Sequence, residues 1–307
     1  MSKRVLIFIE IGEIHMSITE GYIEVTGGKV WYQIHDKDTG KTPLIILHGG
    51  PGSSHYSLQG LRVLAEDRPV IFYDQLGCGK SDRPDDASLW KIERFVEELG
   101  QIKAALSLDR VHILGHSWGT TLAAAYILSN PEGIESVIFS SPCLSAPLWA
   151  EDQERNRKHL PEEVQAILKA CEETGTTNSE EYKTATAVFN KHFVCRLDPM
   201  PAFLKEGAQY KNPDIYNFMW GPSEFHVTGN LRNFDCTSQL KEITIPTLYT
   251  CGRFDEATPE STNYFSSLTP GAKFHVFENS AHMPYLEETD EYVKVIKQFL
   301  HNIDQNK

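Results

Sequence analysis

The sequence has no excess of basic residues, and this absence argues against two classes of binding partner. Its 307 residues include 42 acidic and 29 basic side chains, which gives a formal net charge of −13. Nucleic acids and anionic membrane surfaces attract proteins through a positive field, so neither is expected as a partner. An acidic surface is usual for a soluble protein, and it mildly favours cationic ligands.

Closely spaced cysteine pairs are also absent. The six cysteines are widely scattered and none belongs to a C-x-x-C pair: Cys78, Cys143, Cys171, Cys195, Cys236 and Cys251. A structural zinc site and a thioredoxin-like redox site therefore have no support. In a chain of this length, such spacing predicts reduced, mostly buried thiols and a cytoplasmic location.

No apolar run in the sequence is long enough to cross a membrane. The stretch Val5-Leu6-Ile7-Phe8-Ile9 is short, and no small-residue cleavage site follows it, so it is also a poor signal peptide. We interpret residues 1–16 as an N-terminal extension that precedes the main domain. The sequence contains no internal repeats and no low-complexity tracts.

Strand and helix patterns alternate through the first half of the chain. Residues 21–26 and 29–35 flank Gly27-Gly28 and predict a β-hairpin. Apolar runs predict buried strands at residues 43–47, 69–73, 111–114 and 134–139, with helices at 57–66 and 89–106. This alternation predicts an α/β fold, with a mostly parallel central sheet flanked by helices on both faces.

A charged, helical segment interrupts this pattern from about residue 146 to residue 240. Helices are predicted at residues 151–174 and 179–193, and strands return at 246–251 and 272–278 before a closing amphipathic helix at 287–302. We therefore predict an α/β core made of residues 17–145 and 241–307, with residues 146–240 inserted as a helical cap.

The sequence G-H-S-W-G at residues 115–119 predicts a nucleophilic serine. It follows an apolar strand and precedes a helix, which is the context that a G-x-S-x-G nucleophile requires. Ser117 would occupy the strained turn, and a side chain two positions before or after it would collide with neighbouring backbone. Haloalkane dehalogenases and epoxide hydrolases would carry aspartate at this position, so both are excluded.

A serine hydroxyl needs a base and an acid that orients the base, each on a loop after a later strand. His282 follows the strand at residues 272–278 and is the predicted base. Two acids, Asp255 and Glu256, follow the strand at residues 246–251. We favour Asp255 as the acid because it comes first after the strand and has the shorter side chain.

The negative oxygen that forms during acyl transfer needs hydrogen-bond donors. One predicted donor is the backbone N–H of Trp118, the residue after the nucleophile. The loop H-G-G-P-G at residues 48–52 follows the strand at 43–47, and its glycines allow close approach of the backbone to a substrate. We expect Gly50 to be the second donor.

The sequence resembles the proline iminopeptidases, which are prolyl aminopeptidases of the α/β-hydrolase fold, and it is similar to the tricorn-interacting aminopeptidases. The resemblance extends from about residue 21 to the C-terminus. Four motifs carry it: H-G-G-P-G at 48–52, D-Q-L-G-C-G-K-S at 74–81, G-H-S-W-G at 115–119 and G-R-F-D-E at 252–256. The first two motifs are much narrower in distribution than G-x-S-x-G.

The resemblance implies that acidic residues beneath a helical cap bind the free α-ammonium of the substrate. Glu224, in W-G-P-S-E-F, and Glu256 match the two positions concerned. Charge-assisted hydrogen bonds from two carboxylates in a dry cleft would select a free N-terminus. Trp149, Phe218 and Trp220 are candidate walls for the pocket that accepts the first side chain.

The function predicted is a cytoplasmic serine aminopeptidase that releases the first residue, expected to be proline, from short peptides through an acyl-enzyme. Amino-acid amides with a free amino group are possible substrates too, and no metal or organic cofactor is implied. Two alternatives stay open: an amidase or esterase on the same fold, and a non-catalytic, ligand-sensing relative.

Overall fold

The computed structural model describes the backbone of residues 5–9 and the whole of residues 16–305. Within these residues, nine strands form one sheet in the order β1-β2-β3-β5-β4-β6-β7-β8-β9. Neighbours from β5 to β9 are parallel, whereas β1, β2 and β3 pair antiparallel at one edge. The strands are β1 (Val5–Ile9), β2 (Met16–Val25), β3 (Gly28–Asp36), β4 (Leu44–Leu47), β5 (Val70–Tyr73), β6 (Val111–Ser117), β7 (Ile134–Pro142), β8 (Thr247–Gly252) and β9 (Lys273–Phe277).

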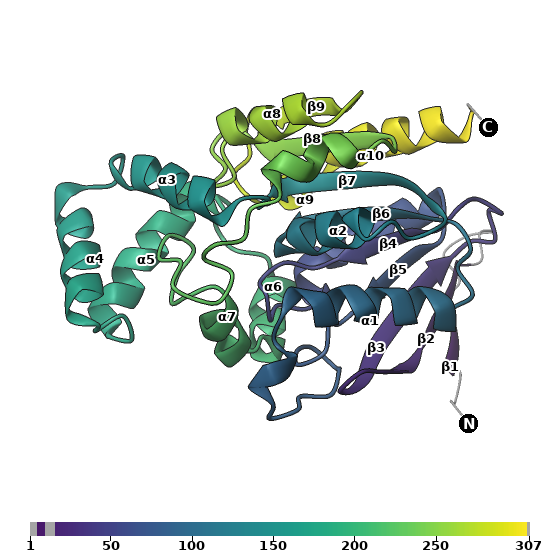
Figure 1. Cartoon of the computed structure of the whole chain (residues 1–307), viewed down its shortest axis with the longest axis horizontal. Coiled ribbons are helices and arrows are strands. Elements are labelled where there is room, and N and C mark those ends of the chain that lie inside the picture. The colour runs from purple at the N-terminus through teal and green to yellow at the C-terminus, as the bar shows by residue number, and fades with distance from the viewer. Residues whose placement is uncertain (1–4, 10–15, 306–307) are drawn as a thin grey trace.

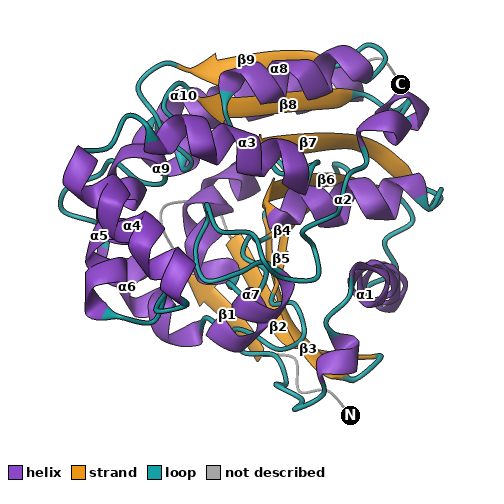
Figure 2. Cartoon of the chain, turned by 60° about the vertical axis from the view of Figure 1, so that its left-hand side comes forward, coloured by secondary structure: helices purple, strands orange, loops and turns teal. Residues whose placement is uncertain are grey.

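The apolar runs of the sequence form strands that are buried on both faces, as predicted. Successive residues of β4 contribute to different hydrophobic cores, with Ile45 in one and Ile46 in the other. Helices α1 (Ile92–Ala105), α2 (Trp118–Leu128) and α8 (Pro259–Leu268) pack on the first face. The second face is covered by α10 (Thr289–Asp304) and by 3-10 turns over His55–Glu66, where the sequence predicted a regular helix. Helices thus flank the sheet on both sides (Figure 2).

The N-terminal segment contributes to the same sheet. Strand β1 pairs antiparallel with β2, from Val5 opposite Glu20 to Ile9 opposite Met16. The predicted extension at residues 1–16 therefore includes an edge strand and the first residue of β2. The other residues of that segment lie outside the described part of the chain. Among the described helices, none is long and apolar enough to cross a membrane.

The inserted segment forms a group of helices beyond the sheet edge at which β7 ends, on the left of Figure 1. These helices are α3 (Ala146–Arg157), α4 (Glu162–Thr174), α5 (Glu180–Phe193), α6 (Ala202–Gly207) and α7 (Pro213–Met219). Helices α4 and α5 share a small hydrophobic core of their own, which includes Leu168 and Phe189. The division into core and cap at residues 146 and 240 stays a prediction.

The single helix predicted over residues 151–174 is wrong in one respect, because the structure contains two helices there. Helix α3 ends at Arg157 and α4 begins at Glu162, directly after Pro161. Proline has no N–H to donate to the preceding turn, and its ring clashes with the carbonyl four residues earlier. The proline therefore ends one helix and starts the next.

Parallel strands bring their carboxyl ends to one edge of the sheet. Strand β6 ends at Ser117 itself, and the ends of β4, β8 and β9 are followed by residues 48–52, 253–256 and 278–282. All of the predicted catalytic residues therefore lie at the edge that the inserted helices cover. The short helix α9 (Pro284–Glu287) begins just after residue 282.

The predicted state of the cysteines is confirmed, because all six are buried free thiols.

Candidate active site

Ser117 is the last residue of β6 and immediately precedes α2, with backbone angles of φ 55° and ψ −126°. The turn is tight enough to require glycine on both sides. A Cβ atom on Gly115 would lie 2.3 Å from the carbonyl oxygen of Gly119, and one on Gly119 would lie 2.2 Å from the carbonyl oxygen of Leu47. These distances confirm the steric reason for the glycines, and they leave the serine on a strained turn.

His282 and Asp255 come together from the loops after β9 and β8. The Nδ1 atom of His282 lies 2.7 Å from Oδ1 of Asp255, and both side chains are buried. The same carboxylate accepts hydrogen bonds from the backbone N–H groups of Gly252 and Ala257, at 3.1 and 2.8 Å. Asp255, rather than Glu256, therefore makes the hydrogen bond expected of the orienting acid.

The electrostatic environment of His282 favours its protonated form. Burial alone would lower the pKa of this imidazole, but Asp255 and Glu224 raise it above its usual value. Its Nε2 atom lies 3.6 Å from Oε1 of Glu256. In the described part of the chain, Ser117 makes no hydrogen bond to this ring. Such bonds are often long in an empty site and shorten only when the substrate is bound.

Two residues that the sequence analysis did not single out hold the backbone of His282. Its carbonyl oxygen accepts a hydrogen bond from Nε2 of His116 at 2.8 Å and another from Oγ of Ser141 at 3.2 Å. Burial lowers the pKa of His116 to about 3, so this ring is a neutral donor at ordinary pH. Position 116 is one of the two variable positions of G-x-S-x-G, so the motif gives it no role. Ser141 has a left-handed backbone conformation (φ 52°) and belongs to no recognisable motif, so neither residue could be found from the sequence.

The predicted oxyanion loop is shaped by Gly50. Its φ is +113°, and a Cβ atom there would lie 2.7 Å from the backbone nitrogens of Gly52 and Ser53. Gln75 joins this loop to the nucleophile turn, because its side chain donates to the carbonyl oxygen of His48 at 3.0 Å and accepts from Nε1 of Trp118 at 2.8 Å. One glutamine thus fixes the segments that carry both expected oxyanion donors.

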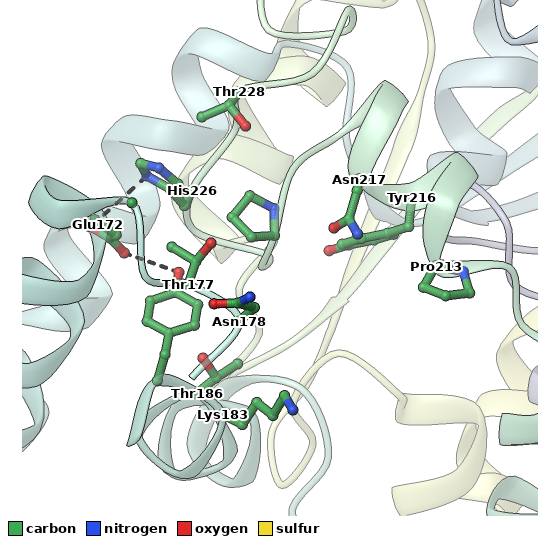
Figure 3. A pocket seen from close by; sticks show the side chains of 13 residues that line it. Glu172, Thr177, Asn178, Lys183, Thr186, Pro213, Tyr216, Asn217, His226 and Thr228 are labelled. Atoms are coloured by element: carbon green, nitrogen blue, oxygen red, sulfur yellow. Dashed lines mark hydrogen bonds and ion pairs between the residues drawn. The ribbon is translucent and has the colours of Figure 1, made fainter. Parts of the chain in front are cut away.

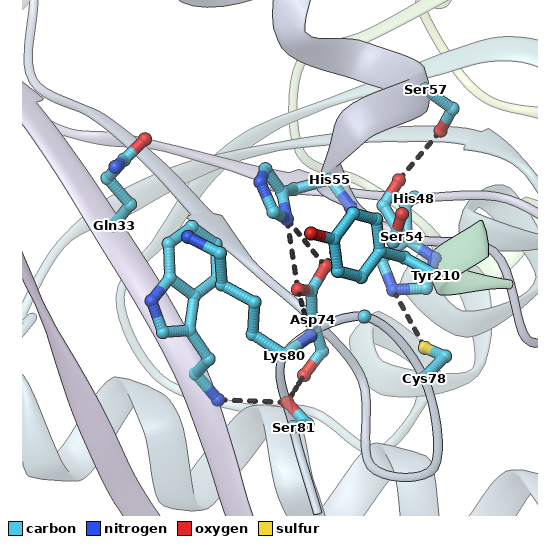
Figure 4. A network of polar contacts seen from close by, with 12 residues as sticks. Gln33, His48, Ser54, His55, Ser57, Asp74, Cys78, Lys80, Ser81 and Tyr210 are labelled. Carbon is cyan, nitrogen blue, oxygen red and sulfur yellow. Dashed lines mark hydrogen bonds and ion pairs between the residues drawn. The ribbon is translucent and has the colours of Figure 1, made fainter. Parts of the chain in front are cut away.

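The rest of the D-Q-x-G-x-G-x-S motif holds this region together. Asp74 accepts hydrogen bonds from the backbone N–H and Nδ1 of His55, at 2.7 and 2.9 Å, and from the backbone N–H of Lys80 at 2.9 Å. The Ser81 hydroxyl donates to the backbone oxygen of Asp74 (Figure 4). A Cβ atom on Gly79 would lie 2.0 Å from the Asp74 carboxylate, which explains the second glycine of the motif.

Four of the predicted site residues line one small pocket. Ser117, Gly50, Trp118 and Glu224 line it, together with Thr121, Cys143, Trp149 and Trp220. Trp149 packs edge-on against the rings of Trp220 and His282, and its Nε1 donates to the backbone oxygen of Glu224 at 2.8 Å. Two of the three candidate wall aromatics are thus in place. The third, Phe218, is 46% exposed and is not among the lining residues.

Glu256 is completely buried, and neither of its carboxylate oxygens has a hydrogen-bond partner within the described residues. Burial, with the nearby charges of Glu224 and Asp255, raises the pKa of Glu256 well above its usual value. Burial also raises the pKa of Glu224. The backbone of Glu256 is held from the inserted helices, since its N–H donates to Phe193 and its carbonyl accepts from Gln153. Glu256, whose buried carboxylate accepts no hydrogen bond within the described residues, and the nearby Glu224 together form a site that a cation would neutralise.

A much larger cavity, of about 700 Å³, lies between α5 and α7 (Figure 3). It contains none of the predicted site residues, so size alone would have located the chemistry in the wrong place. Over residues 16–305, no three His, Cys, Asp or Glu side chains are grouped to hold a metal ion.

Comparisons with known proteins show the family to which the chain belongs. Residues 42–289 match the family model for the alpha/beta hydrolase fold. A protein named proline iminopeptidase from Heyndrickxia coagulans is 68% identical over 286 residues, which cover 93% of this chain and 99% of that protein. One of the same name from Saccharolobus solfataricus is 36% identical, covering 96% of each chain.

Two solved structures are similar over nearly their whole length. The crystal structure of a proline iminopeptidase from Mycobacterium smegmatis has a TM-score of 0.86 and 34% identity, and it covers 94% of this chain and 99% of its own. The crystal structure of VinJ has a TM-score of 0.89 and 33% identity, with coverages of 92% and 98%.

Proposed function

The chain belongs to the proline iminopeptidase family of α/β-hydrolases, and on this premise we propose that it is a serine aminopeptidase that releases N-terminal proline from peptides. The observation that carries the proposal is the buried carboxylate of Glu256, which accepts no hydrogen bond within the described residues and lies near Glu224. Neither acid is needed to break the bond. A free α-ammonium is the substrate group that would neutralise them.

The number of acids suits proline in particular. An N-terminal proline carries a secondary ammonium with two N–H groups, and Glu224 and Glu256 can each accept one hydrogen bond. A primary ammonium would bring a third N–H into the same dry site, where an unpaired donor is costly. The rings of Trp149 and Trp220, which line the pocket, offer apolar surface to the pyrrolidine ring.

Substrate binding would also prepare the base. Nε2 of His282 faces Oε1 of Glu256 at 3.6 Å. An ammonium that pairs with Glu256 removes this competing partner and leaves Nε2 available to Ser117. His282 then takes the Ser117 proton while Asp255 holds Nδ1–H, and Oγ attacks the carbonyl carbon of the first residue.

The remaining steps use the same groups. The backbone N–H groups of Gly50 and Trp118 stabilise the oxyanion, and His282 gives its proton to the departing nitrogen as the C–N bond breaks. Water, deprotonated by His282, then attacks the acyl-enzyme ester and releases the amino acid. An amino-acid amide presents the same ammonium and carbonyl groups, so the site would accept it as well.

A substrate panel with a variant tests the proposal. We expect the wild type to hydrolyse proline 4-nitroanilide faster than the alanine, leucine and phenylalanine anilides, and much faster than 4-nitrophenyl butyrate. Ser117→Ala should reduce kcat by several orders of magnitude. A large preference for the butyrate would favour the esterase alternative, and activity retained in Ser117→Ala would exclude Ser117 as the nucleophile.

A further inference from the structure

The end of helix α5 contacts the segments that follow β8 and β9, which carry the catalytic acid and base. The carbonyl oxygen of Phe193 accepts a hydrogen bond from the N–H of Glu256 at 3.2 Å, in the loop after β8. The guanidinium carbon of Arg196 lies 3.9 Å from the centre of the Phe254 ring in the same loop. The N–H of Arg196 donates to Oε1 of Glu287 in α9 at 2.7 Å. Residues 193–196 are therefore docked on both catalytic segments.

Glu287 bridges this end of α5 and the loop of the base with a single carboxylate. Its Oε1 atom accepts the N–H of Arg196, and its Oε2 atom accepts the N–H of Ala281 at 2.8 Å. Ala281 is completely buried and directly precedes His282. A carboxylate has two acceptor oxygens, and its hydrogen bonds are stronger than those between neutral groups. The backbone at His282 is thereby tied to the inserted helices.

The charge of Glu287 also affects the imidazole. Burial alone would lower the pKa of His282, and Glu287 is one of the charges that raise it, together with Asp255 and Glu224. Burial raises the pKa of Glu287 itself, and the backbone N–H groups that bond to its carboxylate oppose this shift because they favour the ionised form. Geometry and charge thus both relate Glu287 to the base, even though the reaction described above does not use it.

Resting on the function proposed above, we infer that Glu287 is a positioning residue, which holds His282 in line with Ser117 by tying its loop to the end of α5. The side chains of His116 and Ser141 hold the carbonyl of His282 from strands β6 and β7. Glu287 holds the N–H of the preceding residue from the side of the inserted helices. The base is therefore in place for proton transfer only while these helices are docked on the core.

Glu287→Gln tests the inference. The glutamine has a similar size but only one acceptor oxygen, so one of the two backbone N–H groups would face an NH₂ group. We expect kcat on proline 4-nitroanilide to fall by about tenfold and KM to change by less than about twofold, because the base moves and the ammonium site does not. Expressing kcat per Ser117 titrated with a fluorophosphonate removes the contribution of unfolded protein. An unchanged kcat, with or without a raised KM, would overturn the inference.

Glu288→Gln is the matched control. The carboxylate of Glu288 accepts hydrogen bonds from the N–H of Asn279 at 2.9 Å and the hydroxyl of Ser280 at 2.6 Å, in the same loop, and within the described residues it makes no bond to the inserted helices. Its kcat should stay within about twofold of the wild type, and equal losses in the two variants would overturn the inference. If Glu287→Gln does not fold, Glu287→Asp provides the same test, because it keeps the charge but is too short to reach both N–H groups.

The rate at which the fluorophosphonate labels Ser117 separates this inference from the proposed function. The probe carries no ammonium group, so its reaction depends on Ser117 and His282 and not on Glu224 or Glu256. We expect labelling to be about tenfold slower in Glu287→Gln than in the wild type. Labelling at the wild-type rate would overturn the inference and leave the proposed function intact. A wild type that is labelled but does not hydrolyse proline 4-nitroanilide would instead reject the proposed function.

Discussion

At the scale of single residues, much of the site is set by close backbone approaches. Gly119 stands where a Cβ atom would be 2.2 Å from a backbone oxygen, whereas Gly100, in α1, has its nearest neighbour at 3.8 Å from the Cβ position. The motif predicts the first constraint from sequence, because a nucleophile turn has a known geometry. Nothing in the sequence separates Gly100 from a glycine that is required.

Gly119→Ala should therefore destabilise the protein, by about 1–3 kcal/mol, which is the usual cost of forcing an extra methyl group into a packed site. The measurement is the free energy of unfolding by urea denaturation. Gly100→Ala is the matched control, and it should stabilise the protein by up to about 1 kcal/mol through helix propensity. Equal effects of the two changes would contradict the steric account of the turn.

The charge of Glu224 should be visible in the pH profile. His282 acts as a base only when neutral, so kcat/KM falls as the pH drops through the imidazole pKa, which Asp255 and Glu224 raise. Glu224→Gln removes one of these charges and lowers that pKa. The acid limb of the kcat/KM profile should then shift to lower pH, although kcat/KM itself decreases.

In Glu224→Gln, the size of kcat/KM reports substrate binding, and the position of the acid limb reports the pKa of His282. A decrease in kcat/KM at every pH with an unmoved acid limb would show that Glu224 does not interact with His282. An acid limb that moves to higher pH would contradict the sign of the interaction.

At the scale of elements, the sequence predicted most strands and the order of the site loops, because buried parallel strands are continuous apolar runs. It predicted one helix where Pro161 separates two, and it did not predict β1, whose short apolar run carries no information about its partner. The hydrogen bond from His116 to the carbonyl of His282 could not be predicted either. It joins β6 to the loop after β9, across 166 residues of sequence.

The hydrogen bond from His116 to the backbone of His282 should affect kcat more than it affects KM. His116→Leu removes the donor to the His282 backbone, so we expect kcat to fall by about tenfold or more, with a much smaller change in KM. His116→Gln offers an amide donor at a similar position and should recover part of the loss. Steady-state kinetics on proline 4-nitroanilide measures both. Equal kcat in the two variants would argue against a positioning role for this hydrogen bond.

At the scale of the whole molecule, the site is a composite of distant segments. Residues 48–52, 115–119, 220–224, 252–256 and 282 come from both halves of the sheet and from the inserted helices. Chain order and motif spacing predicted that Ser117, Asp255 and His282 would meet, whereas Glu224 was indicated only by the family resemblance. They could not predict the unpaired carboxylate of Glu256 or the cavity between α5 and α7, because both depend on how helices from different parts of the chain pack.

The central claim is that Glu224 and Glu256 recognise a free N-terminus, and blocking that terminus tests it most directly. The measurement is kcat/KM of the wild type on proline 4-nitroanilide and on its N-acetyl derivative. The account predicts a loss of at least about a hundredfold on acetylation, because a neutral amide brings no positive charge to the two carboxyl groups. Comparable hydrolysis of the two anilides would contradict it.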